Sequence, residues 1–510
     1  MKRIAKLFFS RLFIIALAIL MQLFWFLYVF LRLSRVFTSL NIVLSVVALV
    51  LMLHVINRRM NPYGKLAWCV IILGFPLLGV LLYILLGRSE LTKRTRKRLE
   101  QVNQEILPHL SRNPEYEQEL KQTDTDAYLQ SEYIAKWAGA PLYRHTQTRY
   151  YGSGEEMFES LLKDIQEAKS YIFMEYFILD EGYMLQTIID ALEKKVQEGV
   201  KVRLIYDDMG CVSTLPSHFD KALQKKGIDC AVFNRLRPMI SVIMNNRDHR
   251  KILVVDGRIA YTGGVNLADE YINRISRFGY WKDSGIRLEG EAVWSFTCMF
   301  LEMWNYIKRS SENCEQYRSA LPLQELPSDG FVQPYSDSPL DRERIAENVY
   351  LNIIQKAEKY VYIFTPYLIT GNELLVALCN AAKSGVDVRI VTPGIPDKKL
   401  VYLMTQADYA VLIESGVKIY HYSKGFMHAK NFVCDDKIAT VGSVNLDFRS
   451  LYLHFECGVF LYDSAAVKAC KQDALQVIRE SREVDLEFCR HRKLPVRLLQ
   501  SVLRLFAPLL

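Results

Sequence analysis

The chain has 510 residues, half of which are hydrophobic, and its formal net charge is +8. A chain of this length is too long to fold around a single core, so we expect two or three domains. The charge is modest for this size, and it permits attraction to anionic lipid or nucleic acid without identifying either as a partner.

The first ninety residues contain three long apolar runs that the rest of the chain lacks. The runs extend over Leu12 to Leu31, Leu40 to Ile56 and Leu66 to Leu86. A helix that spans a bilayer needs about 17 to 25 such residues. A secretory signal peptide is the alternative for the first run, but this run is too long and no small-residue cleavage site follows it. The sequence therefore predicts a membrane region over residues 1–98 with two or three transmembrane helices.

A dense cluster of basic residues follows the third run: Arg88, Lys93, Arg94, Arg96, Lys97 and Arg98. The positive-inside rule places such a cluster in the cytoplasm. If all three runs cross the membrane, the basic residues on its two sides nearly balance; if the first run lies on or re-enters the inner face, the asymmetry becomes strong. The ten cysteines include no C-x-x-C pair, which argues against a zinc site or redox motif and suits reduced thiols. The sequence therefore predicts a cytoplasmic catalytic portion.

A regular alternation of strands and helices begins after a polar helical connector predicted for residues 99–140. Tyr171 to Leu179 is a largely apolar run typical of a buried strand, Met184 to Gln197 has the pattern of a helix, and Val200 to Tyr206 is a second strand. This strand–helix–strand order predicts a largely parallel sheet with helices on its faces.

The same order of elements returns in the second half of the chain. Val361 to Leu368 matches the first strand of the earlier series, and Gly385 to Val391 matches the second. This is one α/β fold duplicated and not a short-period repeat. The predicted domains are 141–324 and 325–490. An amphipathic tail over 491–510 either lies on the membrane or caps the second domain.

Each half contains the pattern H-x-K-x4-D, followed by a Gly-Gly or Gly-Ser pair and then Asn. The candidate catalytic residues are His249, Lys251, Asp256, His428, Lys430 and Asp435. The candidate substrate-binding residues are Gly264, Asn266, Ser443 and Asn445. A single copy arises by chance in about a few per cent of chains of ordinary composition. Two copies with the same offsets inside a duplicated fold are not accidental.

The residue types in this pattern suit chemistry on a phosphodiester. On a strand, His249 and Lys251 would point to the same side, and the Asp256-Gly257 pair predicts a tight turn into a hairpin. Two such edges that face each other supply lysines and asparagines for the phosphate oxygens, one histidine to attack phosphorus and another to protonate the departing alcohol. No metal or other cofactor is required, because imidazole is the nucleophile. The motif aspartates are explained more readily by the turn than by phosphate contact.

A nucleophilic imidazole needs a hydrogen-bond acceptor at its remote nitrogen. The candidates are Asp283 and Glu456, each on the strand that follows a hairpin. The pair Asp207-Asp208 could be read as a metal site, but the second copy has Thr392-Pro393 at the matching place. We therefore interpret the pair as part of a polar loop. The remaining histidines have no counterpart in the other copy and are interpreted as surface, core or supporting residues: His54, His109, His145, His218, His421, His454 and His491.

At these residues the sequence resembles the phospholipase D superfamily, and within it the bacterial cardiolipin synthase branch. The superfamily motif, HxKxxxxD with GGxN or GSxN, is present twice. The resemblance to the branch rests on Asn61 to Arg88 and on the segments FMEYFILDEG, YWKDSGIRLEG, VGSVNLDFRSL and RLFAPLL. It covers nearly the whole chain from about residue 60, and the apolar run before residue 33 is the part that it matches least.

The resemblance implies two tandem phospholipase D-like α/β/α domains, related by a pseudo-two-fold axis, with one active site between them. It implies a membrane enzyme of bacteria that transfers a phosphatidyl group from one phosphatidylglycerol to a second, giving cardiolipin and glycerol. His249 would form the phosphohistidine and His428 would act as general acid and then base. Lys251 and Lys430 would bind the phosphate together with the two motif asparagines. The implied partners are phosphatidylglycerol and membrane lipid, and not nucleic acid.

Several other functions are compatible with the same histidines. A lipid hydrolase forms the same phosphohistidine but lets water complete the reaction. A phosphatidylserine synthase or a nuclease would share the motif, although a nuclease fits poorly behind three apolar runs. A membrane scaffold with decayed catalytic modules is the alternative from a different class, and two complete motifs argue against it. The sequence leaves the oligomeric state open.

Overall fold

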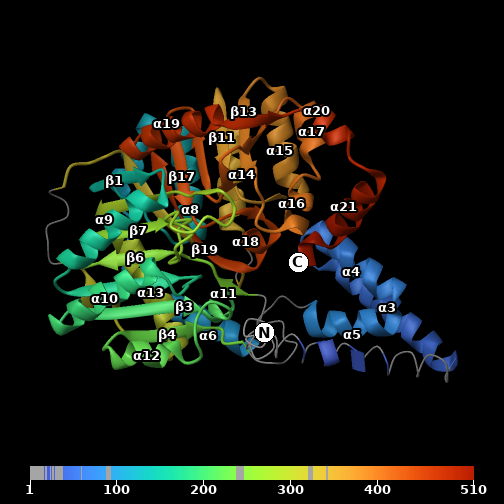
Figure 1. Ribbon diagram of the computed structural model, residues 1–510, viewed down its shortest axis with the longest axis horizontal. Coiled ribbons are helices and arrows are strands. Elements are labelled where there is room, and N and C mark those ends of the chain that lie inside the picture. Colours follow the sequence, from blue (N-terminus) through green and yellow to red (C-terminus); the bar gives the residue numbers. More distant parts are fainter. Residues whose placement is uncertain are drawn as a thin grey trace.

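The computed structural model describes residues 38–58, 60–87, 93–236, 246–319, 326–340 and 343–509, with isolated positions between 17 and 28. Two mixed α/β units lie against each other, and a group of N-terminal helices lies at one side of them (Figure 1). The predicted apolar run from Leu12 to Leu31 falls mostly outside the described residues, which include only isolated positions of it.

The first unit is built on a seven-stranded sheet in the order β1-β9-β7-β6-β2-β3-β4. Only β2, β3 and β4 run parallel to one another, and every other neighbour pair is antiparallel. The prediction of a largely parallel sheet was therefore wrong, because the motif segment returns as a hairpin beside β2. The strands are β1 Thr146–Tyr151, β2 Tyr171–Tyr176, β3 Lys201–Asp207, β4 Asp229–Phe233, β6 Ile252–Val255, β7 Ile259–Gly263 and β9 Gly285–Gly290.

Helices cover this sheet and connect its parallel strands. α10 joins β2 to β3, and α13 packs on the first sheet and also against β10 of the second unit. The helices are α9 Gly154–Glu167, α10 Tyr183–Gln197, α11 Asp208–Cys211, α12 Phe219–Lys225, α13 Val293–Lys308 and the 3-10 turn Cys314–Tyr317. Because α13 contacts both units, one hydrophobic core extends from the first sheet into the second.

The second unit repeats this plan. Its sheet has the order β10-β19-β17-β16-β11-β13-β14-β20, in which β11, β13 and β14 are parallel. The strands are β10 Phe331–Asp337, β11 Tyr360–Phe364, β13 Asp387–Pro393, β14 Lys418–Tyr422, β16 Asn431–Cys434, β17 Ile438–Gly442, β19 His454–Tyr462 and β20 Ser481–Val484. The helices are α14 Ile345–Lys356, α15 Asn372–Lys383, α16 Lys399–Thr405, α17 Tyr409–Glu414, α18 Phe448–Tyr452, α19 Ala465–Arg479, α20 Leu486–Arg490 and α21 Leu494–Phe506.

The two units exchange short strands at the motif segments. β5, Arg247–Asp248, belongs to the first unit but pairs in parallel with β19 of the second. β15, Gly425–Met427, belongs to the second unit but pairs in parallel with β8, Tyr280–Lys282, of the first. A smaller sheet within the second unit joins β12, Leu368–Ile369, to β18, Leu446–Asp447. The exchanged strands fix the relative position of the two motifs.

The predicted connector is helical and packs on both units. It consists of α6 Lys93–Ile106, a short 3-10 turn, α7 Pro114–Thr123 and α8 Thr125–Trp137. α6 lies against α13 of the first unit and α8 against α14 of the second. The domain limits given above stay predictions.

The N-terminal helices differ from the three predicted spans. α3 covers Thr38–Asn57, but the third apolar run is two helices, α4 Pro62–Gly74 and α5 Pro76–Leu86. The break falls at Phe75, which has φ −138° and ψ 74°, because a residue that precedes proline is pushed out of the helical region. Across the described residues, the structure contains no helix with both the length and the apolar character to span a bilayer.

The C-terminal helix α21 and the N-terminal helix α4 lie together beside the second unit. α21 packs against α16 and α4, where Gln500 donates to the carbonyl oxygen of Leu403 at 2.9 Å. The Nδ2 atom of Asn61, just before α4, donates to the hydroxyl of Tyr452 at 2.9 Å. The predicted C-terminal tail is therefore a helix that covers part of the second unit, and one face of it stays exposed.

Candidate active site

The two motif histidines lie between short strands, each held by the backbone of the other unit. His249 follows β5 and His428 follows β15, and neither lies within a regular strand as predicted. The backbone N–H of His249 donates to the carbonyl oxygen of Phe455 at 2.9 Å. The N–H of His428 donates to the carbonyl oxygen of Lys282 at 2.7 Å. The strand exchange thus places both imidazoles at the junction of the two units.

Each imidazole also contacts a carboxylate of the other unit. Nδ1 of His249 lies 2.9 and 3.0 Å from the two carboxylate oxygens of Glu456. Nδ1 of His428 lies 2.6 Å from Oδ2 of Asp283. Both carboxylates are fully buried. Because Nδ1 of each ring is engaged, Nε2 is the nitrogen available to a substrate.

Two buried lysines complete the cluster. Nζ of Lys251 donates to the carbonyl oxygen of His249 at 2.5 Å, and Nζ of Lys430 donates to that of His428. Each lysine is 1% exposed. Burial lowers the pKa of Lys251 to about 8, although Glu456 raises it. Burial, opposed by Asp283, lowers the pKa of Lys430 to about 7. A bound phosphate favours the charged form of both lysines, and two ammonium groups kept from water attract it strongly.

The pKa values of the histidines show that the two halves share one electrostatic environment. Burial lowers the pKa of His249 well below its usual value, and the charges of Lys251, Lys430 and His428 lower it further. Burial and Lys430 lower the pKa of His428 to about 4, against the opposing effect of Asp283. Both rings are therefore neutral near pH 7 in the absence of a bound anion, and a neutral ring has the lone pair that attack requires.

The Gly-Gly and Gly-Ser pairs fit different carboxylates. A Cβ atom on Gly264 would lie 2.0 Å from Oδ1 of Asp283, so this position accepts only glycine beside the short aspartate. At the matching place Ser443 donates its hydroxyl to Oε2 of Glu456. The serine thus holds the longer carboxylate in the second unit, and the glycine makes room for the shorter one in the first.

The two motif asparagines are not equivalent. Oδ1 of Asn266 accepts from the backbone N–H of Ile178 at 3.0 Å, and its Nδ2 donates to the hydroxyl of Tyr271 at 2.8 Å. Oδ1 of Asn445 is buried and has no hydrogen-bond partner among the described residues. Asn266 therefore braces the loop after β2, and Asn445 keeps its carbonyl oxygen uncommitted.

The motif aspartates accept backbone N–H groups at the hairpin turns, which favours the structural interpretation of them over the catalytic one. Asp256 has φ +54° and accepts three backbone N–H groups at the start of β2, at 2.7 to 2.8 Å. It lies seven positions after His249, which corresponds to about 20 Å along an extended chain. It braces the hairpin turn, as the alternative interpretation held.

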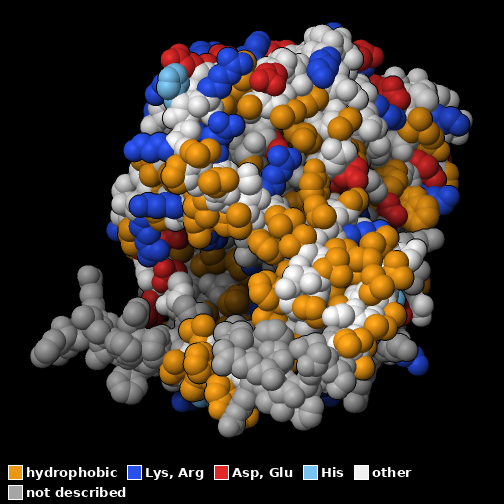
Figure 2. Space-filling view, turned by 90° about the vertical axis from the view of Figure 1, so that its right-hand side faces the viewer, with side chains coloured by type: hydrophobic (Ala, Val, Ile, Leu, Met, Phe, Trp, Pro, Cys, Tyr) orange, Lys and Arg blue, Asp and Glu red, His pale blue; other side chains and the backbone are white. Residues whose placement is uncertain are grey.

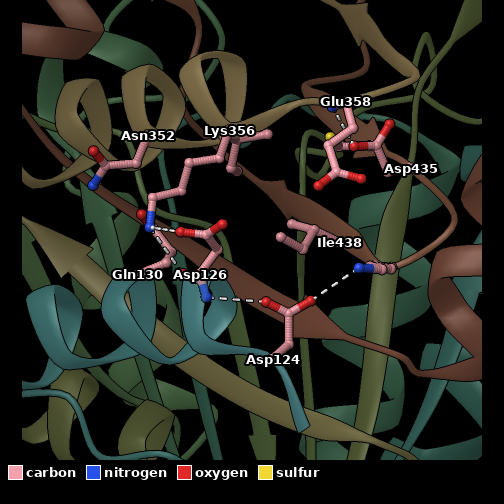
Figure 3. A pocket seen from close by; sticks show the side chains of 11 residues that line it. Asp124, Asp126, Gln130, Asn352, Lys356, Glu358, Asp435 and Ile438 are labelled. Carbon is pink, nitrogen blue, oxygen red and sulfur yellow. Dashed lines mark hydrogen bonds and ion pairs between the residues drawn. The ribbon is translucent and has the colours of Figure 1, made fainter. Parts of the chain in front are cut away.

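Asp435 has the same role in the second unit. It accepts the N–H groups at the start of β11 at 2.7 to 2.9 Å. Figure 3 shows it in the wall of a separate small pocket, where its neighbours include Glu358 and Asp124. None of the residues that line this pocket is a histidine.

Two rings that the sequence pattern did not single out lie against the imidazoles. His454 lies two residues before Glu456, with its ring centroid 5.4 Å from that of His249. Trp281 lies two residues before Asp283, 5.0 Å from the ring of His428, and its Nε1–H donates to Asp283 at 3.4 Å. The shared offset from each carboxylate was the signal, but a histidine and a tryptophan do not look like a repeat.

A duplicated α/β fold with paired H-x-K segments at its junction defines a phospholipase D-like protein. The family described as "Cardiolipin synthase, PLD-like domain" matches residues 161–277 and 350–478, and the one described as "Phospholipase_D-nuclease N-terminal" matches 43–88. The solved phosphatidylserine synthase of Haemophilus influenzae Rd KW20 has a TM-score of 0.56 at 17% identity. The match covers 75% of this chain and 98% of that one, and it shows the fold alone.

Curated relatives define the family more narrowly. A cardiolipin synthase of Geobacillus sp. is 32% identical over 473 residues, which are 92% of this chain and 93% of the relative. An uncharacterized protein of Streptococcus mutans serotype c is 42% identical over 458 residues, which are 90% of this chain and 99% of that protein. The chain belongs to the cardiolipin synthase family of phospholipase D-like phosphatidyltransferases.

Proposed function

We propose that this chain synthesises cardiolipin by transferring the phosphatidyl group of one phosphatidylglycerol to a second, with release of glycerol. The observation that carries the proposal is the buried junction of the two units, where two carboxylate-bound imidazoles and two lysines share one site. Membership in the cardiolipin synthase family supports the choice of substrate.

In the first half-reaction His249 attacks the phosphorus of phosphatidylglycerol through Nε2, because Nδ1 is engaged with Glu456. A bond forms between Nε2 and phosphorus while the bond from phosphorus to the glycerol oxygen breaks. His428 gives its Nε2 proton to that oxygen, and glycerol leaves. The Asp283 carboxylate and the charge of the bound phosphate favour the protonated form of His428, which suits the acid.

In the second half-reaction His428 acts as a base, and the bond between phosphorus and His249 is broken. A hydroxyl of the second phosphatidylglycerol loses its proton to Nε2 of His428 and attacks phosphorus. The bond between phosphorus and Nε2 of His249 breaks, and cardiolipin leaves. Lys251 and Lys430 stabilise the negative charge that develops on the phosphate oxygens.

We propose further that one side of the molecule binds the bacterial cell membrane, with the two catalytic units in the cytoplasm and residues 1–98 as the membrane region. Figure 2 faces this side, and hydrophobic side chains gather over its lower half. The exposed apolar side chains here come from α3, α4, α5, α16 and α21: Ile42, Val46, Val50, Leu53, Leu66, Val70, Leu73, Ile84, Leu400, Leu494, Leu498, Leu499 and Val502. Arg497 and Lys493 lie beside them in the sequence and suit anionic headgroups.

A lipid assay tests the proposed reaction. Protein purified in detergent and treated with EDTA should convert phosphatidylglycerol into equal amounts of cardiolipin and glycerol, without CTP. Formation of phosphatidic acid alone would show a hydrolase. No turnover of any phospholipid would favour the scaffold.

A further inference from the structure

His454 lies in the active site but has no part in the mechanism above. It is 8% exposed, and neither of its ring nitrogens has a hydrogen-bond partner among the described residues. A buried polar group without a partner costs about 1 to 3 kcal/mol, and folded proteins contain few of them. We therefore infer that this buried imidazole, which lies beside the reacting imidazole, binds a group from outside the chain.

Three donor atoms converge beside this ring. Oε1 of Glu456 lies 2.9 Å from Nδ1 of His249 and 3.6 Å from Nδ1 of His454. One donor atom of each residue lies within 4.8 Å of the other two, and all three residues are buried. In a tetrahedral zinc site with bonds near 2.0 to 2.1 Å, neighbouring donors are about 3.3 Å apart. Two of the pairs, at 2.9 and 3.6 Å, lie on either side of this value, and the third is within 4.8 Å.

We propose that His249, Glu456 and His454 bind one divalent transition-metal ion, such as Zn²⁺, and that the bound ion inhibits the enzyme. Two imidazoles with one carboxylate are a ligand set that zinc and related metals adopt in proteins. The inhibition rests on the proposed function, whereas the binding does not.

The inhibition follows from the chemistry of the His249 ring. The ion takes the lone pair of Nδ1 in place of the proton that this atom shares with Glu456. That proton moves to Nε2 of the same ring, so Nε2 no longer has a lone pair with which to attack phosphorus. The ring stays neutral, nothing is oxidised or reduced, and removal of the ion restores the first tautomer.

The other half of the site cannot bind an ion in this way. Trp281 occupies the place that matches His454, and its indole nitrogen donates to Asp283 at 3.4 Å. An indole nitrogen is a donor only and has no lone pair to offer a metal. We therefore expect one ion per chain.

Titration of the metal-free, full-length protein in detergent tests the proposal. We expect the wild type to bind one Co²⁺ with the visible absorption of a tetrahedral site, and Zn²⁺ to displace it and raise the melting temperature. His454→Phe keeps a ring of similar size but removes the donor, and should weaken Zn²⁺ binding by about tenfold or more. His491→Phe changes an exposed histidine and should bind as the wild type does.

Two results would overturn the proposal: equal Zn²⁺ affinity of the wild type and His454→Phe, or no saturable Co²⁺ binding by the wild type. The wild-type spectrum and melting shift decide the matter even if His454→Phe fails to fold, and His454→Gln supplies a second variant. Zn²⁺ should also stop cardiolipin formation until EDTA is added. Metal binding without lipid turnover would contradict only the proposed function, and turnover without metal binding only this inference.

Discussion

The two halves of the active site share a backbone plan but differ in three side chains. In the half around His428 the carboxylate is Asp283, with Gly264 beside it and Trp281 against the ring. In the half around His249 these places hold Glu456, Ser443 and His454. Each half is itself composite, because the carboxylate always comes from the other unit.

This difference fits the division of roles between the two histidines in the proposed mechanism. Asp283 lies closer to its imidazole, at 2.6 Å, and opposes the lowering of the pKa of His428, which suits a group that must hold a proton. His249 has its pKa lowered by burial and by the neighbouring charges of Lys251 and Lys430, which suits a group that must offer a lone pair. The asymmetry predicts different roles for two residues that the sequence pattern presents as equals.

Removal of either imidazole should have the largest effect. We expect His249→Asn and His428→Asn each to lower kcat by about 10⁴-fold or more, because each ring makes or breaks a bond in both half-reactions. The double variant should be little worse than either single variant, since the two rings act as a unit. Cardiolipin formation from labelled phosphatidylglycerol measures this loss. A single variant that keeps a tenth of wild-type activity would contradict the role assigned to that histidine.

Neutralising the carboxylates should come next. Glu456→Gln and Asp283→Asn keep the shapes but lose the charge that orients Nδ1, and we expect each to lower kcat by about 10²- to 10⁴-fold. Rates measured over a range of pH should separate the halves, because Asp283 supports the acid and Glu456 the nucleophile. Loss of activity with an unchanged pH profile in both variants would show that the two carboxylates do not differ in role.

The glycine and serine positions offer a rescue experiment. A side chain at Gly264 would displace the carboxylate of Asp283, so Gly264→Ser should lower kcat by about 10- to 100-fold. The pair Gly264→Ser with Asp283→Glu rebuilds the arrangement of Ser443 and Glu456, and should recover part of the loss. A double variant that is no better than Gly264→Ser alone would show that the two halves are not interchangeable in this way.

The smallest effect concerns stability against pH. Burial lowers the pKa of His428 to about 4 in the folded chain, whereas an unfolded histidine titrates near about 6.5. Between these values the unfolded chain takes up a proton that the folded chain does not, so stability falls as the pH falls, by at most about 1.4 kcal/mol per pH unit. Acidification from pH 6.5 to 5 should therefore lower the Tm of the wild type more than that of His428→Gln. Equal slopes for the two proteins would contradict this.

The sequence predicted the duplicated fold and the residues of the site better than their geometry. The two H-x-K segments, Asp283 and Glu456 were all found, because repeated spacing and residue type are visible in one dimension. The exchange of β5 and β15 was not, because strand pairing between units depends on contacts far apart in the chain. His454 was not singled out for a different reason: its counterpart in the other unit is a tryptophan, so the two positions do not look like a repeat.

Prediction from the sequence was less accurate where a single residue determines the local backbone or where a motif residue has a structural role. The run from Leu66 to Leu86 has the apolar length of a span, but Pro76 divides it into two helices at Phe75. The motif aspartates complete a pattern that reads as catalytic, yet Asp256 and Asp435 bind the backbone of the neighbouring strands.

The most direct test of the central claim is to trap the phosphoenzyme. Rapid acid-free denaturation of the protein during turnover of ³²P-labelled phosphatidylglycerol, followed by digestion, should give one labelled peptide that contains His249. The label should be absent from His249→Asn, and in His428→Asn it should appear on the same peptide but form more slowly. Label on the peptide of His428 in the wild type would contradict the roles assigned here, and a wild type that turns over without any labelled histidine would contradict the mechanism.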